Sequence, residues 1–292
     1  MASPPRIAVL TGATGGIGRW IALGLARADY HLVVICRDRS RGEALTQWLV
    51  QQTSSPVTLD IRLADLSSLA ETRQVGERIA RDYPSITLLI NNAGIFRADW
   101  RTTSEGREDV LAVNHLSPYL LSDVLEDALR AGAPSRIVNV GSSTSDSGRL
   151  DPHRLERGKS ARFAIWDRVR AYRESKLAMM LATFTRAERL QGSGVTANVV
   201  HPGMVATGLI RERGAIGLAW KIMAPFCLSE EQGARTPVFA ALDPSWAALT
   251  GKYLKKCAVA RPNPCSADAP LRDAVEVATR GLIAETVGAQ AR

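Results

Sequence analysis

The amino-acid sequence predicts one α/β domain in which a doubly wound parallel sheet of about seven strands carries helices on both faces. Three observations favour this fold class. Short apolar runs alternate with longer amphipathic stretches along the 292 residues, a pattern typical of parallel sheets with crossover helices. A glycine-rich segment directly follows the first apolar run. No linker or internal repeat divides the chain, so we expect residues 1–292 to form a single domain.

The expected strands are short, mostly β-branched and bounded by Gly, Asp or Pro, which is typical of strands buried on both faces. They lie at residues 7–10, 32–35, 57–63, 87–90, 136–140, 195–200 and, as the weakest run, 251–254. Amphipathic helices are expected at residues 17–28, 40–52, 67–83, 115–131 and 169–190. Ser40 and Ser67 are candidate N-caps, because a serine side chain can accept a hydrogen bond from a backbone N–H in the first helical turn.

Composition argues against several classes of protein. The net charge is +8, but the basic residues are mostly dispersed and no nucleic-acid-binding motif is visible, so nucleic acid is not an expected partner. The first residues lack an apolar signal region and no run approaches the ~20 apolar residues of a membrane span, so a cytoplasmic location is expected. The cysteines form no C-x-x-C pair, and we expect no metal site.

The glycine-rich segment supplies the first candidate site. Gly12, Gly16 and Gly18 stand between the first strand and the first helix. Glycine is needed where backbone turns tightly or approaches a phosphate, and the start of the helix then offers N–H groups and a positive dipole end to that phosphate. In this position the segment predicts a dinucleotide-binding turn.

The residues after the second strand indicate which dinucleotide binds. NAD-dependent enzymes place a carboxylate here for the ribose hydroxyls, whereas this chain has Cys36 followed by Arg37. A guanidinium can hold a 2′-phosphate through two hydrogen bonds, and Arg41 can assist. Asp38 is a nearby carboxylate that argues for the opposite choice. On balance the sequence favours NADP(H).

Tyr172 and Lys176 are the candidate proton-transfer pair. They are four residues apart in an expected helix, so both lie on one face of it. An ammonium beside a phenol stabilises the phenolate and lowers the pKa of a tyrosine from about 10 toward the working pH. Such a tyrosine can act as general acid in reduction and general base in oxidation. The spacing alone is common, so its weight comes from the motifs around it.

In their order along the chain, these motifs resemble those of the short-chain dehydrogenase/reductase family. The matching segments are residues 11–18, Asp65-Leu66, 91–94, Asn114, Ser142, Tyr172-x-x-x-Lys176 and Pro202-Gly203. The resemblance implies a Rossmann fold and an NADP(H)-dependent oxidoreductase that acts on a carbonyl or alcohol. Residues 36–38, 91–95, 175–178, 201–203 and 251–253 are similar to the branch that contains retinol dehydrogenases. That likeness implies a bulky or lipophilic aldehyde or ketone as substrate.

The resemblance also implies catalytic roles. Tyr172 would exchange the proton with the substrate oxygen, and Lys176 would bind the nicotinamide ribose and lower the pKa of the tyrosine. Ser142 would hold the carbonyl oxygen, with Ser143 as the alternative because either serine fits the register after the fifth strand. Asn114 would position a water molecule that links Lys176 to solvent.

Cofactor contacts implied by the same resemblance run along the chain. Asp65 and Leu66 would meet the adenine ring, residues 92–94 would pass under the adenosine ribose, and the loop at residues 202–207 would meet the nicotinamide carboxamide. The full expected set is Gly12, Thr14, Gly16, Ile17, Gly18, Arg37, Asp65, Leu66, Asn92, Ala93, Gly94, Tyr172, Lys176, Pro202, Gly203, Val205 and Thr207.

The two ends of the chain are expected to differ in role. Residues 6–207 would form the cofactor and catalytic core, and residues 208–292 a substrate lid and C-terminal region. The apolar stretch at residues 215–227 has three open interpretations: a lid, a packed helix or dimer surface, or a peripheral membrane contact. His115 and His201 have no visible charge partner and are interpreted as structural.

Two other function classes stay open. A catalytically silent NADP(H)-binding sensor on the same fold would have lost a catalytic residue, and all four are present. A sugar-nucleotide epimerase or dehydratase would have different glycine spacing and a longer C-terminal domain. The expected partners are a small-molecule carbonyl or alcohol substrate and, by resemblance, further copies of the chain in a homo-dimer or tetramer.

Overall fold

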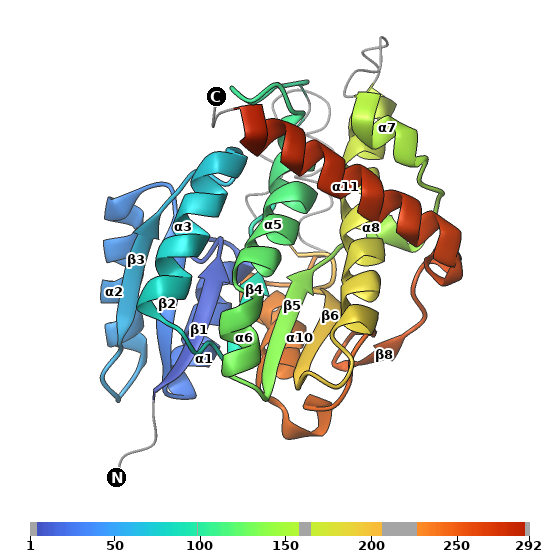
Figure 1. Cartoon of the computed structure of the whole chain (residues 1–292). Coiled ribbons are helices and arrows are strands. Elements are labelled where there is room, and N and C mark those ends of the chain that lie inside the picture. Colours follow the sequence, from blue (N-terminus) through green and yellow to red (C-terminus); the bar gives the residue numbers. More distant parts are fainter. Residues whose placement is uncertain (1–4, 98, 158–164, 206–226, 290–292) are drawn as a thin grey trace.

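An eight-stranded sheet in the order β3-β2-β1-β4-β5-β6-β7-β8 forms the centre of the structure (Figure 1). The computed structural model describes residues 5–97, 99–157, 165–205 and 227–289, apart from the side chains at 154, 156, 157, 165–167 and 289. Strands β1 to β7 pair in parallel and β8 pairs antiparallel to β7. The predicted fold class is therefore confirmed, with one strand more than expected.

Seven strands coincide with the seven predicted apolar runs. They are β1 (Arg6–Thr11), β2 (Tyr30–Cys36), β3 (Leu59–Leu63), β4 (Leu88–Asn91), β5 (Ser135–Val140), β6 (Val195–His201) and β7 (Tyr253–Lys255). The added strand, β8 (Ala258–Ala260), is a three-residue edge strand whose first two residues are exposed. After β3 the chain returns to the other side of β1, so β1 and β4 flank the point where strand order reverses. Ligands of such sheets bind beyond the carboxyl ends of the strands at this point.

Helices cover both faces of the sheet (Figure 1). One face carries α1 (Ile17–Arg27), α2 (Arg39–Gln52) and α10 (Glu230–Leu242). The other carries α3 (Leu69–Asp82), α4 (Asp109–Leu111), the π-helical turn η1 (Ala112–Leu116), α5 (Ser117–Val124), α6 (Glu126–Ala131) and α8 (Ile165–Arg189). The short elements are η2 (Ser143–Asp146), α7 (Pro152–Arg157), η4 (Pro244–Trp246) and η5 (Pro264–Ala267). The long helix α11 (Ala269–Ala289) crosses the outside of α5 and α8.

Both predicted N-caps are wrong by one or two residues. Asp38 caps α2, because its backbone is extended and its carboxylate accepts a hydrogen bond from the N–H of Arg41 at 3.2 Å. Ser68 caps α3 by accepting from the N–H of Glu71 at 3.2 Å. Ser67 instead donates its N–H to Asp65.

Alternation along the strands divides the core between the two faces of the sheet. Ile7 and Val9 of β1 pack toward α3 and α6, whereas Ala8 and Leu10 pack toward α1 and α2. All four are at most 5% exposed, and burial of each large side chain stabilises the fold by about 1.5–3 kcal/mol. Among the described helices, none is long and apolar enough to cross a membrane.

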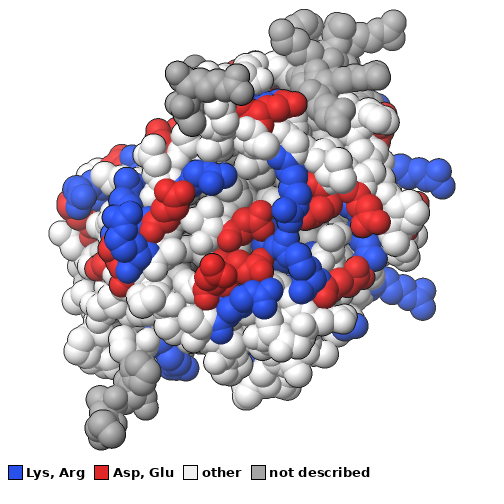
Figure 2. Space-filling view, in the orientation of Figure 1, with Lys and Arg blue, Asp and Glu red and all other residues white. Residues whose placement is uncertain are grey.

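Charges of both signs are interspersed on the face that carries α5, α8 and α11 (Figure 2). Several of them are paired between α5, α6, α8 and α11. The pairs are Arg186–Asp123 (2.7 Å), Arg189–Glu126 (2.7 Å), Arg189–Glu276 (3.9 Å) and Arg272–Glu188 (2.8 Å). On this face the basic side chains therefore do not form a single-sign patch.

Candidate active site

The glycine turn joins β1 to α1 with very little space. Gly12 and Gly16 have φ values of +67° and +57°, in the left-handed region that favours glycine. A Cβ on Gly18 would lie 2.0 Å from the carbonyl oxygen of Gly12, so the helix begins directly against the turn. Gly16 is the N-cap of α1 and provides no side-chain hydrogen bond, and the first turn has no acidic residue. This helix start can therefore receive an anion.

Thr11 and Asn92 fasten the glycine turn to the end of β4. The Thr11 hydroxyl accepts hydrogen bonds from the N–H groups of Asn92 and Ala93, both at 3.0 Å. The Asn92 amide donates back to the carbonyl oxygens of Thr11 and Gly12 at 3.1 and 3.0 Å. A Cβ on Gly12 would lie 2.8 Å from the Cα of Ala93. The sequence reasoning gave Thr11 no role of its own, although it is the first residue of the motif.

Basic side chains lie at the start of α2, and one of them contacts the glycine turn. Arg41 donates to the carbonyl oxygen of Thr14 at 3.1 Å, and Arg37 forms a loose, solvent-exposed ion pair of 3.9 Å with Asp65. The Asp38 carboxylate is held by Ser40 at 2.6 Å and by its capping bond. A hydrogen bond from Ser40 lowers the pKa of Asp38, so it is ionised and engaged with its own helix.

Asp65 and Leu66 lie beyond the carboxyl end of β3, as predicted. The Asp65 carboxylate accepts from the N–H of Ser67 at 2.9 Å. Leu66 is buried, and its carbonyl oxygen accepts from the Ser117 hydroxyl at 2.5 Å. These contacts anchor the loop that pairs with Arg37.

A nicotinamide dinucleotide fits the residues present. The helix start with an uncapped N-terminus suits a pyrophosphate, and the guanidinium group of Arg41 lies at the turn. The buried Oδ1 of Asn92 has no hydrogen-bond partner among the described residues, which leaves an acceptor beside the turn for a ligand donor. This chain therefore offers groups for the phosphates and for the ribose.

Three segments of the chain bring the predicted catalytic residues together. Asn114 lies in η1, Ser142 follows β5, and Tyr172 and Lys176 lie one helical turn apart in α8. The Lys176 ammonium donates to the carbonyl oxygen of Val140 at 2.8 Å. A Cβ on Gly94 would lie 3.3 Å from both the Asn114 Oδ1 and the Lys176 Nζ. The end of β4 thus lies against the amide and the ammonium.

Asn114 is fixed by three hydrogen bonds. Its Oδ1 accepts from the N–H of Ile95 at 2.8 Å, and its Nδ2 donates to the Ile95 carbonyl at 3.0 Å. The Nδ2 also donates to the Ser175 hydroxyl at 3.1 Å, which in turn donates to the Tyr172 carbonyl at 2.8 Å. Ser175 therefore links Asn114 to the tyrosine helix, a connection that sequence spacing does not reveal.

Ser142, rather than Ser143, contacts Tyr172. The hydrogen bond between Ser142 and Tyr172 lowers the pKa of the phenol, and the Ser142 hydroxyl also accepts from the Thr144 hydroxyl at 3.1 Å. Phe96, from the loop after β4, packs edge-on against the Tyr172 ring with 5.6 Å between centroids. Sequence reasoning missed Phe96, because nothing in the motifs marks that position.

Burial is the main cause of the pKa shifts of Tyr172 and Lys176. It raises the pKa of Tyr172, and the Ser142 hydrogen bond only partly opposes this. The predicted lowering of the Tyr172 pKa by Lys176 is therefore not seen, because the ammonium is directed to Val140. Burial also lowers the pKa of Lys176 to about 8.

The loop after β6 packs against both α1 and α10. Gly203 has φ +95°, and a Cβ there would lie 2.5 Å from the Leu228 Cδ1. A Cβ on Gly233 would lie 2.5 Å from Val205 and 2.8 Å from Ile17, which places these three residues together at the start of α1. The expected contacts of Thr207, and residues 215–226 of the apolar stretch, lie outside the described residues.

His115 and His201 differ in the groups that surround them. His115 is buried and its Nε2 lies 2.7 Å from the Thr279 hydroxyl, and burial lowers its pKa to about 3. The prediction that His201 has no charge partner is wrong. Burial and the charge of Lys255 lower the pKa of His201 to about 4, while Asp146 opposes them. Both groups come from distant parts of the chain.

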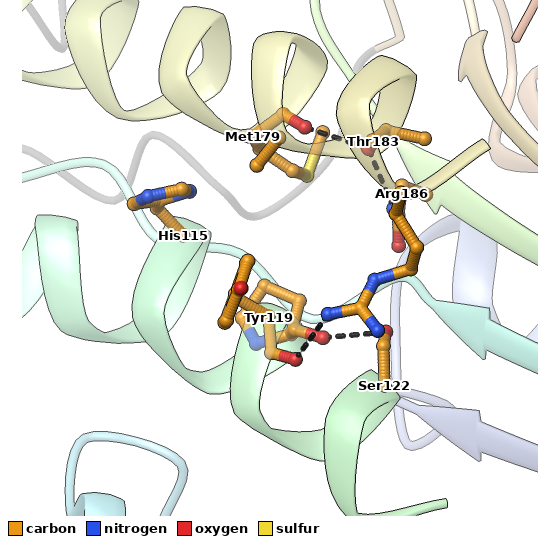
Figure 3. Close-up of a pocket in the computed structure, with 9 residues that line it drawn as sticks. His115, Tyr119, Ser122, Met179, Thr183 and Arg186 are labelled. Atoms are coloured by element: carbon orange, nitrogen blue, oxygen red, sulfur yellow. Dashed lines mark hydrogen bonds between the residues drawn. The ribbon is translucent and has the colours of Figure 1, made fainter. Parts of the chain in front are cut away.

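A small polar cavity lies between α5 and α8, and its lining includes none of Asn114, Ser142, Tyr172 and Lys176 (Figure 3). It is about the size of one water molecule. Arg186 reaches across it and donates to the Tyr119 carbonyl at 3.1 Å. The buried Nδ1 of His115, which lines it, has no hydrogen-bond partner among the described residues. The cavity is too small for a substrate.

Comparison with known proteins shows which family this chain resembles. Residues 6–151 match the model of the short chain dehydrogenase family. The chain is 37% identical to mouse (Mus musculus) retinol dehydrogenase 12 over 254 residues, which covers 87% of this chain and 78% of that protein.

Solved structures match over most of the fold. An uncharacterized protein from Mycobacterium Paratuberculosis aligns with a TM-score of 0.74 and 25% identity, covering 95% of this chain and 93% of that chain. The Pseudomonas aeruginosa RhlG/NADP active-site complex aligns with a TM-score of 0.66 and 25% identity, covering 85% and 93%.

Proposed function

Because the chain belongs to the short chain dehydrogenase family, we propose that it is an NADP(H)-dependent oxidoreductase with Tyr172 as its general acid or base. It moves a hydride between the nicotinamide and a carbonyl or alcohol. The observation that carries this proposal is that Asn114, linked through Ser175 to the Tyr172 carbonyl, and the buried Lys176 ammonium meet at Gly94, where a Cβ would lie 3.3 Å from both. These groups lie beside the β4 loop, which is fastened to the glycine turn.

The chain's own groups have distinct tasks in reduction. The cofactor supplies the hydride when it is bound. Tyr172 donates its phenolic proton to the substrate oxygen as negative charge develops there. Ser142 donates a hydrogen bond to the same oxygen and polarises it. Lys176, whose ammonium is held at the Val140 carbonyl, would bind the nicotinamide ribose, and Asn114 holds the adjoining backbone in place.

NADP(H) is favoured over NAD(H) by the start of α2. The one carboxylate that argued for NAD(H), Asp38, is engaged as a helix cap. Arg37 is exposed and Arg41 touches the glycine turn, so both can reach a 2′-phosphate. The NADP complex of the similar Pseudomonas aeruginosa protein supports the same choice.

A bulky or lipophilic aldehyde or ketone is the substrate class that fits best. Phe96 presents an apolar ring beside Tyr172. The relatives named retinol dehydrogenases place retinal and retinol among the first compounds to test.

Tyr172→Phe tests the function. We expect its kcat for NADPH-dependent carbonyl reduction to fall at least 100-fold, because general acid catalysis contributes about 10²–10⁴-fold. The Kd for NADPH, measured by fluorescence titration, should change little.

Tyr119→Phe is the matched control, because it removes a buried phenol that bonds to Glu276 on the outside of the sheet. It should keep its kcat within about twofold, since the Tyr119 hydroxyl bonds to Glu276 of α11 rather than to a residue of the proposed catalytic set. Near-normal turnover in Tyr172→Phe would refute the role of Tyr172. Tight NADPH binding by a wild-type protein that reduces no carbonyl would favour the silent sensor instead.

A further inference from the structure

The turn that carries Ser142 is tied to a distant part of the chain. Ser142 caps η2, and its carbonyl oxygen accepts from the N–H and the hydroxyl of Ser145 at 3.1 and 2.6 Å. The last residue of η2, Asp146, points its carboxylate to the edge of the sheet. There it accepts a hydrogen bond from the Tyr253 hydroxyl at 2.5 Å and pairs with Lys255.

The partners of Asp146 are held firmly. Tyr253 and Lys255 belong to β7, which pairs with β6 in the register Val199↔Tyr253 and His201↔Lys255. Tyr253 is 1% exposed, so its hydroxyl has little freedom to move. A carboxylate held by a buried phenol and an ammonium has a fixed position, and so has the turn that carries it.

A second anchor comes from the loop before η5. Asn263 is 2% exposed and donates its amide to the carbonyl oxygens of Ser145 and Gly148 at 3.0 and 3.1 Å. Its Oδ1 accepts from the N–H of Cys265, which fixes the amide orientation. The turn at residues 142–148 is therefore held at the Asp146 carboxylate and at the carbonyl oxygens of Ser145 and Gly148. The residues that hold it are more than 100 positions away.

We propose that Asp146, Tyr253, Lys255 and Asn263 form a brace that positions Ser142 against Tyr172. The brace rests on the proposed function, because its purpose is to hold the hydroxyl that orients the substrate oxygen. Its members touch neither the substrate oxygen nor the tyrosine. They are positioning residues, and the C-terminal part of the chain thereby becomes part of the catalytic apparatus.

Tyr253→Phe removes one hydrogen bond and keeps the buried ring. We expect kcat to fall about 10- to 100-fold, since a small misplacement of a catalytic group has effects of this size. The KM for NADPH should stay within about twofold, because the cofactor groups lie at other strands. Asn263→Asp, which keeps the acceptor for Cys265 and removes both donated bonds, should act in the same direction.

Tyr83→Phe is the matched control. Tyr83 also donates its hydroxyl to an aspartate, Asp60, but at the β3 edge of the sheet. It should lose stability to a similar extent and keep kcat. An equal loss of kcat in Tyr83→Phe and Tyr253→Phe would overturn the brace, because the effect would then be a general one on folding.

A double-mutant cycle separates positioning from structure. If Tyr253 acts through Ser142, Tyr253→Phe should change kcat less than about twofold when Ser142 is already alanine. The same fold-loss in both backgrounds would overturn the proposal.

Hydrogen exchange gives a readout independent of turnover. The N–H groups of Thr144 and Ser145, which bond to Ser142, should exchange faster in Tyr253→Phe and Asn263→Asp than in the wild type or Tyr83→Phe. Unchanged exchange would refute the brace even in an active enzyme. If the wild type reduced no carbonyl, the proposed function would fail, whereas faster exchange would still support the brace as the anchor of the Ser142 turn.

Discussion

Lys176 carries its ammonium at a place from which water is largely excluded. The side chain is 4% exposed and donates to the Val140 carbonyl. Burial lowers its pKa to about 8 from an ordinary value of 10.5, so below pH 8 the folded protein bears a buried positive charge. Keeping that charge lowers the stability of the fold, which is expected of a group retained for function.

This burial predicts a pH-dependent stability difference between the wild type and Lys176→Met. Between pH 8 and 10.5 the unfolded chain binds more protons than the folded one, so wild-type stability rises with pH in that window. Relative to Lys176→Met, the unfolding free energy of the wild type should increase by about 2–3 kcal/mol from pH 7 to pH 10. Urea unfolding at the two pH values measures it.

Lys252→Met, at an exposed position, is the control and should show the same difference from wild type at both pH values. A constant difference for Lys176→Met as well would mean that the ammonium is solvated in solution.

Single residues were predictable where their role follows from local spacing. The four-residue interval places Tyr172 and Lys176 on one face of a helix, and the structure has them there. The direction of the Tyr172 pKa was not predictable, because it depends on burial against Phe96 and on a contact from Ser142. The charges near His201 were missed for the same reason, since Asp146 and Lys255 are 55 and 54 residues away from it.

At the scale of elements, the beginning of α2 controls the phosphate end of the cofactor site. Asp38 caps the helix, and Arg41 in its first turn contacts the glycine turn through Thr14. The helix therefore holds one arginine in place, while Arg37 stands in the preceding loop. Helix start and glycine turn form one unit.

Arg41→Ala and Arg37→Ala should each weaken NADPH more than NADH. A hydrogen bond to a charged group contributes about 1.5–3 kcal/mol, so we expect KM for NADPH to rise about 10- to 100-fold. KM for NADH should change less than about twofold, because it lacks the 2′-phosphate. Steady-state kinetics with both cofactors measure the ratio.

Arg39→Ala, another exposed arginine of the same helix, controls for the loss of net charge. It should leave the NADPH to NADH preference unchanged. Equal losses with both cofactors in the Arg37 and Arg41 variants would contradict the assignment of the 2′-phosphate site.

Elements with a strong apolar pattern were predictable and irregular ones were not. The seven apolar runs became seven strands, because strands buried on both faces need continuous apolar residues. Only the last two residues of the π-helical turn η1 (Ala112–Leu116) fell within the predicted helix at 115–131, and a π-helical turn leaves no mark on a periodicity of 3.6 residues. Helix α11 was not predicted. Its apolar face is recognised only when it packs against α5 and α8 in the folded domain.

On the scale of the whole molecule, α11 joins the end of the chain to the catalytic half. Val275, Ala278, Leu282 and Ile283 are buried in one cluster with residues of α5 and α8. Thr279 meets His115, the neighbour of Asn114 in η1. The last helix therefore supports the turn on which Asn114 stands.

Leu282→Ala should destabilise the whole domain. The side chain is 4% exposed, and removing a buried leucine side chain costs about 2–5 kcal/mol. Val277→Ala in the same helix, where the side chain is 71% exposed, should change stability by less than about 0.5 kcal/mol. Urea unfolding followed by circular dichroism gives both values. If Leu282→Ala changed the unfolding free energy as little as Val277→Ala, α11 would not be packed against the domain in solution.

The position of α11 also limits how copies of this chain can associate. A subunit contact through the outer sides of α5 and α8 would have to displace α11 and expose Val275 and Leu282 to water. Self-association that keeps the domain intact must therefore use another surface, such as the layer of α1, α2 and α10 or the outer edge of β8.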